Sequence, residues 1–160
     1  MTSGQIEKPS NTPLHAKIEQ LLTEARVVLP GAQALFGFQL AIVLTQSFER
    51  LPSMSKTVHA ASLFLVALAI IMLMAPAAYH RIVYAGEDTQ DMYRIGSALV
   101  TAATVPLALG LAGDIYVVIA KIANSSAAGW LAGAFGLITL IGLWHAYPLA
   151  VAHLCNRASQ

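Results

Sequence analysis

Charged residues are scarce in this chain: Asp, Glu, Lys and Arg make up 11% of its 160 residues, whereas hydrophobic residues make up 57%. About a quarter of the residues of a soluble domain are charged, so this composition indicates a membrane protein. The formal net charge of +1 provides no basic excess for a phosphate backbone, and no motif of a nucleic-acid reader is present. We therefore exclude nucleic-acid binding.

Cysteine is nearly absent as well. The single Cys155 excludes an internal disulfide and a cysteine-based zinc or iron–sulfur site. The chain also lacks an HExxH pattern, a phosphate-binding loop and a recognisable pair of nucleophile and base. We assign no catalytic residue and expect a protein that is not an enzyme.

Long apolar runs are what the sequence does contain. Four of them, at 27–48, 58–79, 95–119 and 127–151, include no Lys or Arg. About 20 apolar residues in a helix cross a bilayer core, and barrel strands would alternate polar with apolar residues, so the runs predict transmembrane helices. Because the connections are short, we predict an all-α integral membrane four-helix bundle with up-down-up-down order.

The flanking segments predict the remaining organisation. We expect a disordered tail at 1–12, an amphipathic juxtamembrane helix at 13–27 that lies at the interface, and a C-terminal tail at 152–160. Pro30 is expected to bend the chain where it enters the membrane. Basic residues are retained on the cytoplasmic side, and more of them flank the side of the termini, so both termini are predicted to be cytoplasmic. On that side lie Lys8, Lys17, Arg26, Arg81, Arg94 and Arg157, against Arg50, Lys56 and Lys121 on the other.

Polar residues inside the spans cost free energy and need a reason. Asp114 in the third span is the clearest, and we favour a structural hydrogen-bonding role over the alternative of ion or proton handling. Gln33, Gln39 and Gln46 recur on one face of the first span and are expected to join helices, although such a stripe could also line a polar path.

Near the cytoplasmic side we predict a polar cluster of Glu24, Arg26, His80, Arg81 and Arg94. Arg81 or Arg94 could bind an anionic lipid headgroup, while the simpler interpretation is a set of ordinary positive-inside residues. His80 and His145 are predicted at similar depth, where facing imidazoles on a bundle can hold haem b or a metal. Hydrogen bonding to neighbours is the simpler interpretation of these histidines.

Two local patterns concern helix ends and helix contacts. Asp88 is expected to cap the third span's helix, with Asp91 in its first turn. Gly129 and Gly133 form a GxxxG pair that predicts a close helix contact, either within the chain or with a second copy. His59 and His153 are placed at opposite membrane faces, so we expect no second histidine pair.

Three segments, 24–31 (EARVVLPG), 75–81 (APAAYHR) and 144–149 (WHAYPL), resemble an uncharacterised bacterial family of small four-span membrane proteins, a domain of unknown function. The resemblance implies four spans, a bacterial inner-membrane location and a recurring pattern that includes Glu24, Arg26, Pro30, His80 and Arg81. It implies no catalytic residue. His145 lies at a position expected to vary, which weakens the paired-histidine hypothesis.

The sequence thus predicts a small multi-pass inner-membrane protein in contact with membrane lipids. It is expected to act as a homo-oligomer in transport, as a channel or as an accessory subunit, and no resident cofactor is expected. The alternative is a membrane redox protein that holds haem or a metal through His80 and His145.

Overall fold

The computed structural model describes residues 13–83 and 87–158, and within these ranges the chain contains helices and no strand. Four long helical rods follow one another: α1 (Leu14–Val43), α3 (Ser53–Val83), α4 (Gln90–Ile122), and α5 (Ser126–Ile141) continued by the π-helix η1 (Gly142–Ala146) and α6 (Tyr147–Ala158). A single short helix, α2 (Gln46–Glu49), lies between α1 and α3. Each rod is long and apolar enough to cross a membrane. The all-α fold with four membrane-type helices is confirmed.

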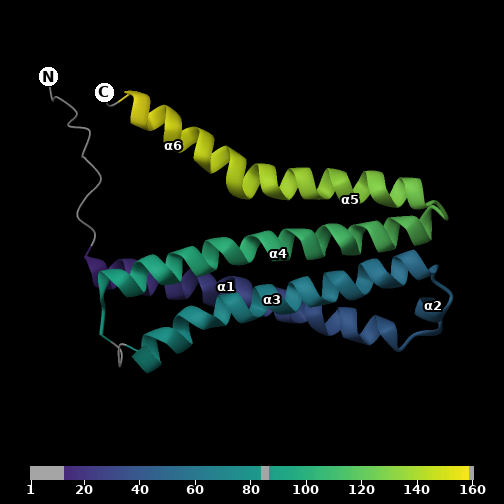
Figure 1. The fold of residues 1–160 in the computed structure, drawn as a ribbon, viewed down its shortest axis with the longest axis horizontal. Coiled ribbons are helices and arrows are strands. Elements are labelled where there is room, and N and C mark those ends of the chain that lie inside the picture. The colour runs from purple at the N-terminus through teal and green to yellow at the C-terminus, as the bar shows by residue number, and fades with distance from the viewer. Residues whose placement is uncertain (1–12, 84–86, 159–160) are drawn as a thin grey trace, which may run out of the picture.

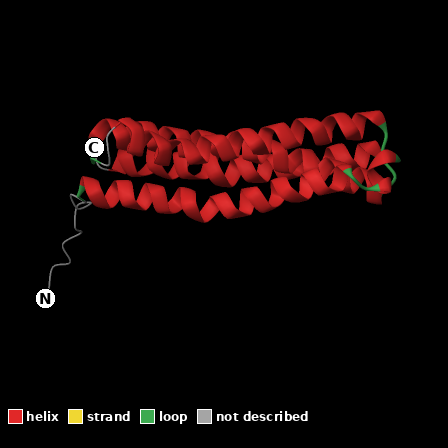
Figure 2. Cartoon of the chain, turned by 90° about the horizontal axis from the view of Figure 1, so that it is seen from below, coloured by secondary structure: helices red, strands yellow, loops and turns green. Residues whose placement is uncertain are grey.

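Successive rods run in opposite directions, so the bundle has the predicted up-down-up-down order (Figure 1). Figure 2 shows from below that the rods lie side by side along the length of the molecule. Helix α3 packs along α4, α1 packs on both of them, and α5 packs on α4. In Figure 1, α4 lies between α3 and α5. The bundle is therefore a three-helix core to which α5 is added along the far side of α4.

The core lies on one stripe of α3, whose buried residues recur every three or four positions, as a helix face requires. They are Ser55, His59, Ser62, Val66, Ala69, Leu73 and Pro76. Small residues of α4 meet this stripe: a Cβ on Gly110 would lie 2.7 Å from Val66 Cγ2 and 3.2 Å from the Ser62 carbonyl oxygen. Side chains this small let the two backbones approach closely, which is how helices associate in a membrane.

The first span differs from its predicted boundaries. The segment at 13–27 continues directly into the span, so α1 is one helix of 30 residues with Pro30 inside it. Its length, roughly 45 Å at 1.5 Å per residue, matches a bilayer with its headgroup layers. The helix passes through Pro30, which is exposed, just as α3 and α4 pass through the buried Pro76 and Pro106. The span ends at Val43 rather than at 48 because Thr45 caps α2, accepting from the Phe48 amide at 3.2 Å.

The other end also differs. The predicted tail at 152–160 is helical as far as Ala158, since α6 ends there. The predicted N-terminal tail, 1–12, lies outside the described residues. The membrane-facing surface of the bundle is apolar: Leu131, Phe135 and Ile138 of α5 are all more than 70% exposed. In water such a surface would be costly, and lipid is the solvent that suits it.

Candidate functional site

Three polar side chains from three different helices meet in the half of the bundle next to α2. Gln39 comes from α1, His59 from α3 and Asp114 from α4. Gln39 and His59 are 3% and 4% exposed, and the Asp114 side chain is 18% exposed. We call these residues the polar triad. Buried polar groups on membrane-type helices mark functional sites more often than surface ones do, because burial without a partner is costly.

The hydrogen bonds of the triad define the state of the histidine. Gln39 Nε2 donates to Asp114 Oδ2 at 2.7 Å, and His59 Nε2 lies 3.0 Å from the Gln39 backbone oxygen. A carbonyl oxygen only accepts, so the ring proton is on Nε2. The other ring nitrogen, Nδ1, then faces Asp114 Oδ1 across 3.9 Å. With a neutral ring and an ionised carboxylate, both of these atoms are acceptors, and one added proton would join them.

The packing around the triad separates it from the rest of the bundle. The Phe48 ring of α2 lies edge-on to the His59 ring, with centroids 5.2 Å apart. Gly113 leaves room for Ser62, since a Cβ on Gly113 would lie 2.0 Å from Ser62 Oγ. Farther along the bundle the core is closed by Ala32, Val66, Ala69 and Leu107, none more than 7% exposed. The Asp114 carboxylate is therefore the most accessible part of the triad.

The amide Gln39 Oε1 is buried and has no hydrogen-bond partner among the described residues. A buried acceptor without a donor costs roughly 1–3 kcal/mol. The other acceptors of the triad are the Asp114 carboxylate and His59 Nδ1, which receives no hydrogen bond from a described residue. The triad thus has more hydrogen-bond acceptors than donors.

Sequence reasoning found two members of the triad and missed the third. Gln39 and Asp114 were singled out as intramembrane polar residues, whereas His59 was placed at a membrane face without a role. The missed signal is the spacing of His59 with Ser62 and Val66, which puts all three on the buried stripe of α3. The third predicted polar residue, Gln33, is exposed on α1 and lies apart from the triad.

At the opposite end of the bundle, the predicted cytoplasmic cluster is dispersed. Glu24 accepts from Gln20 Nε2 of its own helix at 2.9 Å. Arg26 and Arg81 border neighbouring hollows between α1 and α3. Arg94 borders a different hollow, formed by α4 and η1. The three arginines are thus divided between two sides of the bundle.

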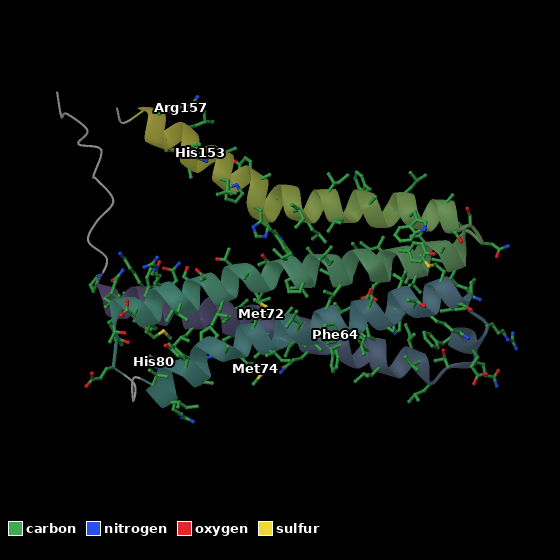
Figure 3. The ribbon with its side chains drawn as sticks, viewed as in Figure 1. Phe64, Met72, Met74, His80, His153 and Arg157 are labelled. Atoms are coloured by element: carbon green, nitrogen blue, oxygen red, sulfur yellow. The ribbon has the colours of Figure 1, made fainter. Side chains whose placement is uncertain are left out.

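His80 has a different partner from those predicted. Its Nε2 lies 3.4 Å from Asp88 Oδ1, while His15 Nδ1 pairs with Asp88 Oδ2 (the end of α3 is marked by His80 in Figure 3). The hydrogen bond with His15 lowers the pKa of the Asp88 carboxyl, with partial desolvation acting against it. The predicted cap is wrong by one residue: Thr89 caps α4 and accepts from the Met92 amide at 3.2 Å.

His145 lies on the other side of α4 from His80. Its Nε2 is 2.8 Å from Thr104 Oγ1, and the Thr104 hydroxyl donates to the Thr101 carbonyl at 2.6 Å, so the ring is the donor to Thr104. His80 and His145 are not brought together, and the haem hypothesis receives no support from their placement. Within 13–83 and 87–158, no three His, Cys, Asp or Glu side chains converge in a way that could hold a metal ion.

The GxxxG pair is used within the chain. A Cβ on Gly129 would lie 2.8 Å from the Tyr116 carbonyl oxygen, and one on Gly133 would lie 3.0 Å from the Ala112 carbonyl oxygen. Both carbonyls belong to α4, so the glycines dock α5 on α4. The Tyr116 ring also contacts Trp130, with centroids 4.5 Å apart. The sequence had left open whether the partner helix belongs to the same chain, and the structure assigns it to α4.

Comparison with known proteins gives one informative finding. A family model described as a family of unknown function (DUF6328) matches residues 9–148. No curated protein and no solved structure matches the chain. The matched range includes every residue of the polar triad.

Proposed function

Since the chain belongs to the family of unknown function DUF6328, its activity must be argued from the site, and we propose a non-enzymatic membrane transport protein that takes up and releases a proton at Gln39, His59 and Asp114. The family and the four membrane-type helices agree with the resemblance found in the sequence. The proton-handling role is the alternative that the sequence left open for Asp114.

The observation that carries this proposal is the gap of 3.9 Å between His59 Nδ1 and Asp114 Oδ1. The opposite nitrogen of the ring is held by the Gln39 carbonyl, so Nδ1 is the free basic atom. A proton on Nδ1 makes an imidazolium beside a carboxylate, and a proton on Asp114 makes a donor toward the ring. In either protonated state His59 Nδ1 and Asp114 Oδ1 can form a hydrogen bond. A contact with a purely structural role would not need two acceptors that face each other without a proton between them.

The path of the proton beyond the triad is an argument for a homo-oligomer. In a single copy, Ala32, Val66, Ala69 and Leu107 close the core beyond the triad. We therefore propose that the protein acts as a homo-oligomer and that the rest of the path lies between copies. The bacterial inner membrane, with both termini in the cytoplasm, remains the proposed location. In mild detergent the protein should elute above the mass of one protomer, and a monomer at all concentrations would contradict the assembly.

Proton flux in reconstituted vesicles tests the activity. Vesicles loaded with a pH-sensitive dye and carrying the wild-type protein should dissipate an imposed pH gradient faster than empty vesicles. Asp114→Asn and His59→Gln should both return the rate to that of empty vesicles. Each variant removes one of the two proton-accepting atoms while keeping nearly the same volume.

The matched control is Asp91→Asn, because Asp91 is an exposed carboxylate in the first turn of the same helix. This variant should transport protons at the wild-type rate. The melting temperatures of the wild type and the variants are compared before reconstitution. Equal values establish that a variant without proton flux is still folded. The proposal is overturned if the wild type gives no flux above empty vesicles, or if Asp114→Asn is as fast as the wild type.

A further inference from the structure

The last helix leaves the bundle and opens a wedge beside α4. Helix α6 contacts η1 and is exposed along its described side chains, whereas α5 packs closely on α4. Pro148 has no amide hydrogen and its ring clashes with the carbonyl four residues earlier, and the π-turn of η1 widens the helix at this point. Figure 1 shows α6 diverging from the first turns of α4.

The floor of this wedge is one face of α4. The hollow has a volume of about 550 Å³, and its residues on α4 recur at spacings of one and three. They are Gln90, Tyr93, Arg94, Ser97, Ala98, Thr101 and Ala102, with His145 of η1 closing the far end. Polar groups lie toward the end of the bundle, and the two alanines make a shallow apolar track between the hydroxyls.

The charge of the wedge has one sign. Arg94 is the charged residue of the lining, and no carboxylate is present among these lining residues. His153 and Arg157 of α6, labelled in Figure 3, are exposed and are not among the lining residues. Basic groups at a membrane interface attract anionic headgroups by roughly 1 kcal/mol each. A groove with a basic mouth and an apolar track has the two-part chemistry of a phospholipid.

We propose that the groove defined by Arg94, Ser97, Ala98, Thr101 and His145 binds one anionic phospholipid. The headgroup lies at Arg94, and an acyl chain follows Ala98 and Ala102 toward His145. The hydrogen bond between His145 and Thr104 holds η1 against α4 at 2.8 Å and so sets the inner end of the groove. The proposal does not depend on proton transport by the triad.

The lining of the groove favours a lipid over a helix of a second copy. Arg94 is accompanied by no carboxylate among the lining residues, while Ala98 and Ala102 supply apolar surface. An anionic lipid brings the complementary charge and an acyl chain together.

Native mass spectrometry of the purified protein tests this proposal. The protein in mild detergent is mixed with phosphatidylglycerol or with phosphatidylcholine, and bound lipid is counted by mass. We expect one phosphatidylglycerol to be retained in preference to phosphatidylcholine. Arg94→Gln should weaken this retention about fivefold, the effect of one basic group near the headgroup. Ala98→Phe should weaken it by filling the track while leaving the charge unchanged.

The control is Arg50→Gln, which removes an exposed arginine at the opposite end of the bundle. It should retain phosphatidylglycerol as the wild type does. The proposal is overturned if the two lipids are retained equally, if Arg50→Gln and Arg94→Gln weaken retention to the same extent, or if Arg94→Gln releases a second copy of the chain instead of a lipid. Melting temperatures near the wild-type value establish that the variants are folded.

Discussion

The side-chain amide of Gln39 on α1 donates a hydrogen bond to the Asp114 carboxylate on α4 across 2.7 Å. The Gln39 backbone carbonyl also receives the ring of His59 on α3 at 3.0 Å. One residue of α1 therefore contacts a polar group on each of the other two core helices. Because Gln39 and His59 are both buried, these contacts hold the three helices in one register around the acceptor pair of His59 and Asp114.

Replacing Gln39 should destabilise the bundle. In Gln39→Ala the partly buried Asp114 carboxylate loses its donor, and a hydrogen bond to a charged group contributes roughly 1.5–3 kcal/mol. Unfolding in a denaturing-detergent titration measures the change in the free energy of unfolding. Gln33→Ala on the same helix is the control, because Gln33 is exposed, and it should change stability little. A loss of the same size in both variants would contradict the role assigned to Gln39.

Gly129 should tolerate no side chain. The Cβ of Gly129→Ala would lie 2.8 Å from the Tyr116 carbonyl oxygen and 2.7 Å from Ala120 Cβ, so α5 must move away from α4. Overpacking of this kind costs roughly 1–3 kcal/mol. The matched variant is Gly37→Ala, where nothing lies within 4 Å of the new Cβ. It should leave stability unchanged or raise it by up to about 1 kcal/mol through helix propensity. Thermal melting of the two variants under the same conditions measures the difference. Equal melting temperatures would contradict the close contact of Gly129 with α4.

The transmembrane fold is predictable from the sequence because lipid leaves few alternatives to helices for long apolar runs. The positions of Gln39 and Asp114 inside those runs were likewise enough to mark them as residues with partners. The burial of His59 between helices was missed because only its distance to the end of the run was considered. Its position on the stripe with Ser62 and Val66 determines its burial.

The cytoplasmic cluster illustrates what a sequence leaves open. Hydropathy places Arg26, Arg81 and Arg94 at one depth, but their direction around each helix depends on how the helices pack. Helix α4 separates Arg94 from the other two, and the connection before α4 brings Asp88 to His80 instead. The continuous course of α1 through Pro30 was also missed, because helices of membrane-type proteins tolerate an internal proline, as α3 and α4 do at Pro76 and Pro106.

The hydrogen bond between Asp88 and His15 should make the stability of the fold depend on pH. The hydrogen bond with His15 lowers the pKa of the Asp88 carboxyl in the folded protein. A lowered pKa contributes stability above the ordinary Asp value of about 3.9, and this contribution is lost as the pH falls through the lower folded value. The melting temperature of the wild type should therefore exceed that of Asp88→Asn at about pH 6, and the difference should shrink toward about pH 3.

The neighbouring carboxylate provides the control for this experiment. Glu87 is exposed and directly precedes Asp88, so Glu87→Gln changes the local charge by the same amount. Its melting temperature should follow that of the wild type across the same pH range. A difference between the wild type and Asp88→Asn that stays constant with pH would refute the assignment of the titrating contact to Asp88.

Phe48 should control the access of water-soluble reagents to the polar triad. Its ring lies edge-on to His59, which is 4% exposed, so Phe48→Ala should uncover the imidazole without altering any hydrogen bond of the triad. Diethyl pyrocarbonate, which modifies imidazole nitrogens, should then react with His59 several-fold faster, as measured by peptide mass mapping. The exposed His153 is an internal standard that should react at the same rate in both proteins. Phe64→Ala is the matched variant, because Phe64 is 68% exposed on the outside of α3, and it should leave His59 protected. Equal modification of His59 in the two variants would mean that another part of the bundle shields the triad.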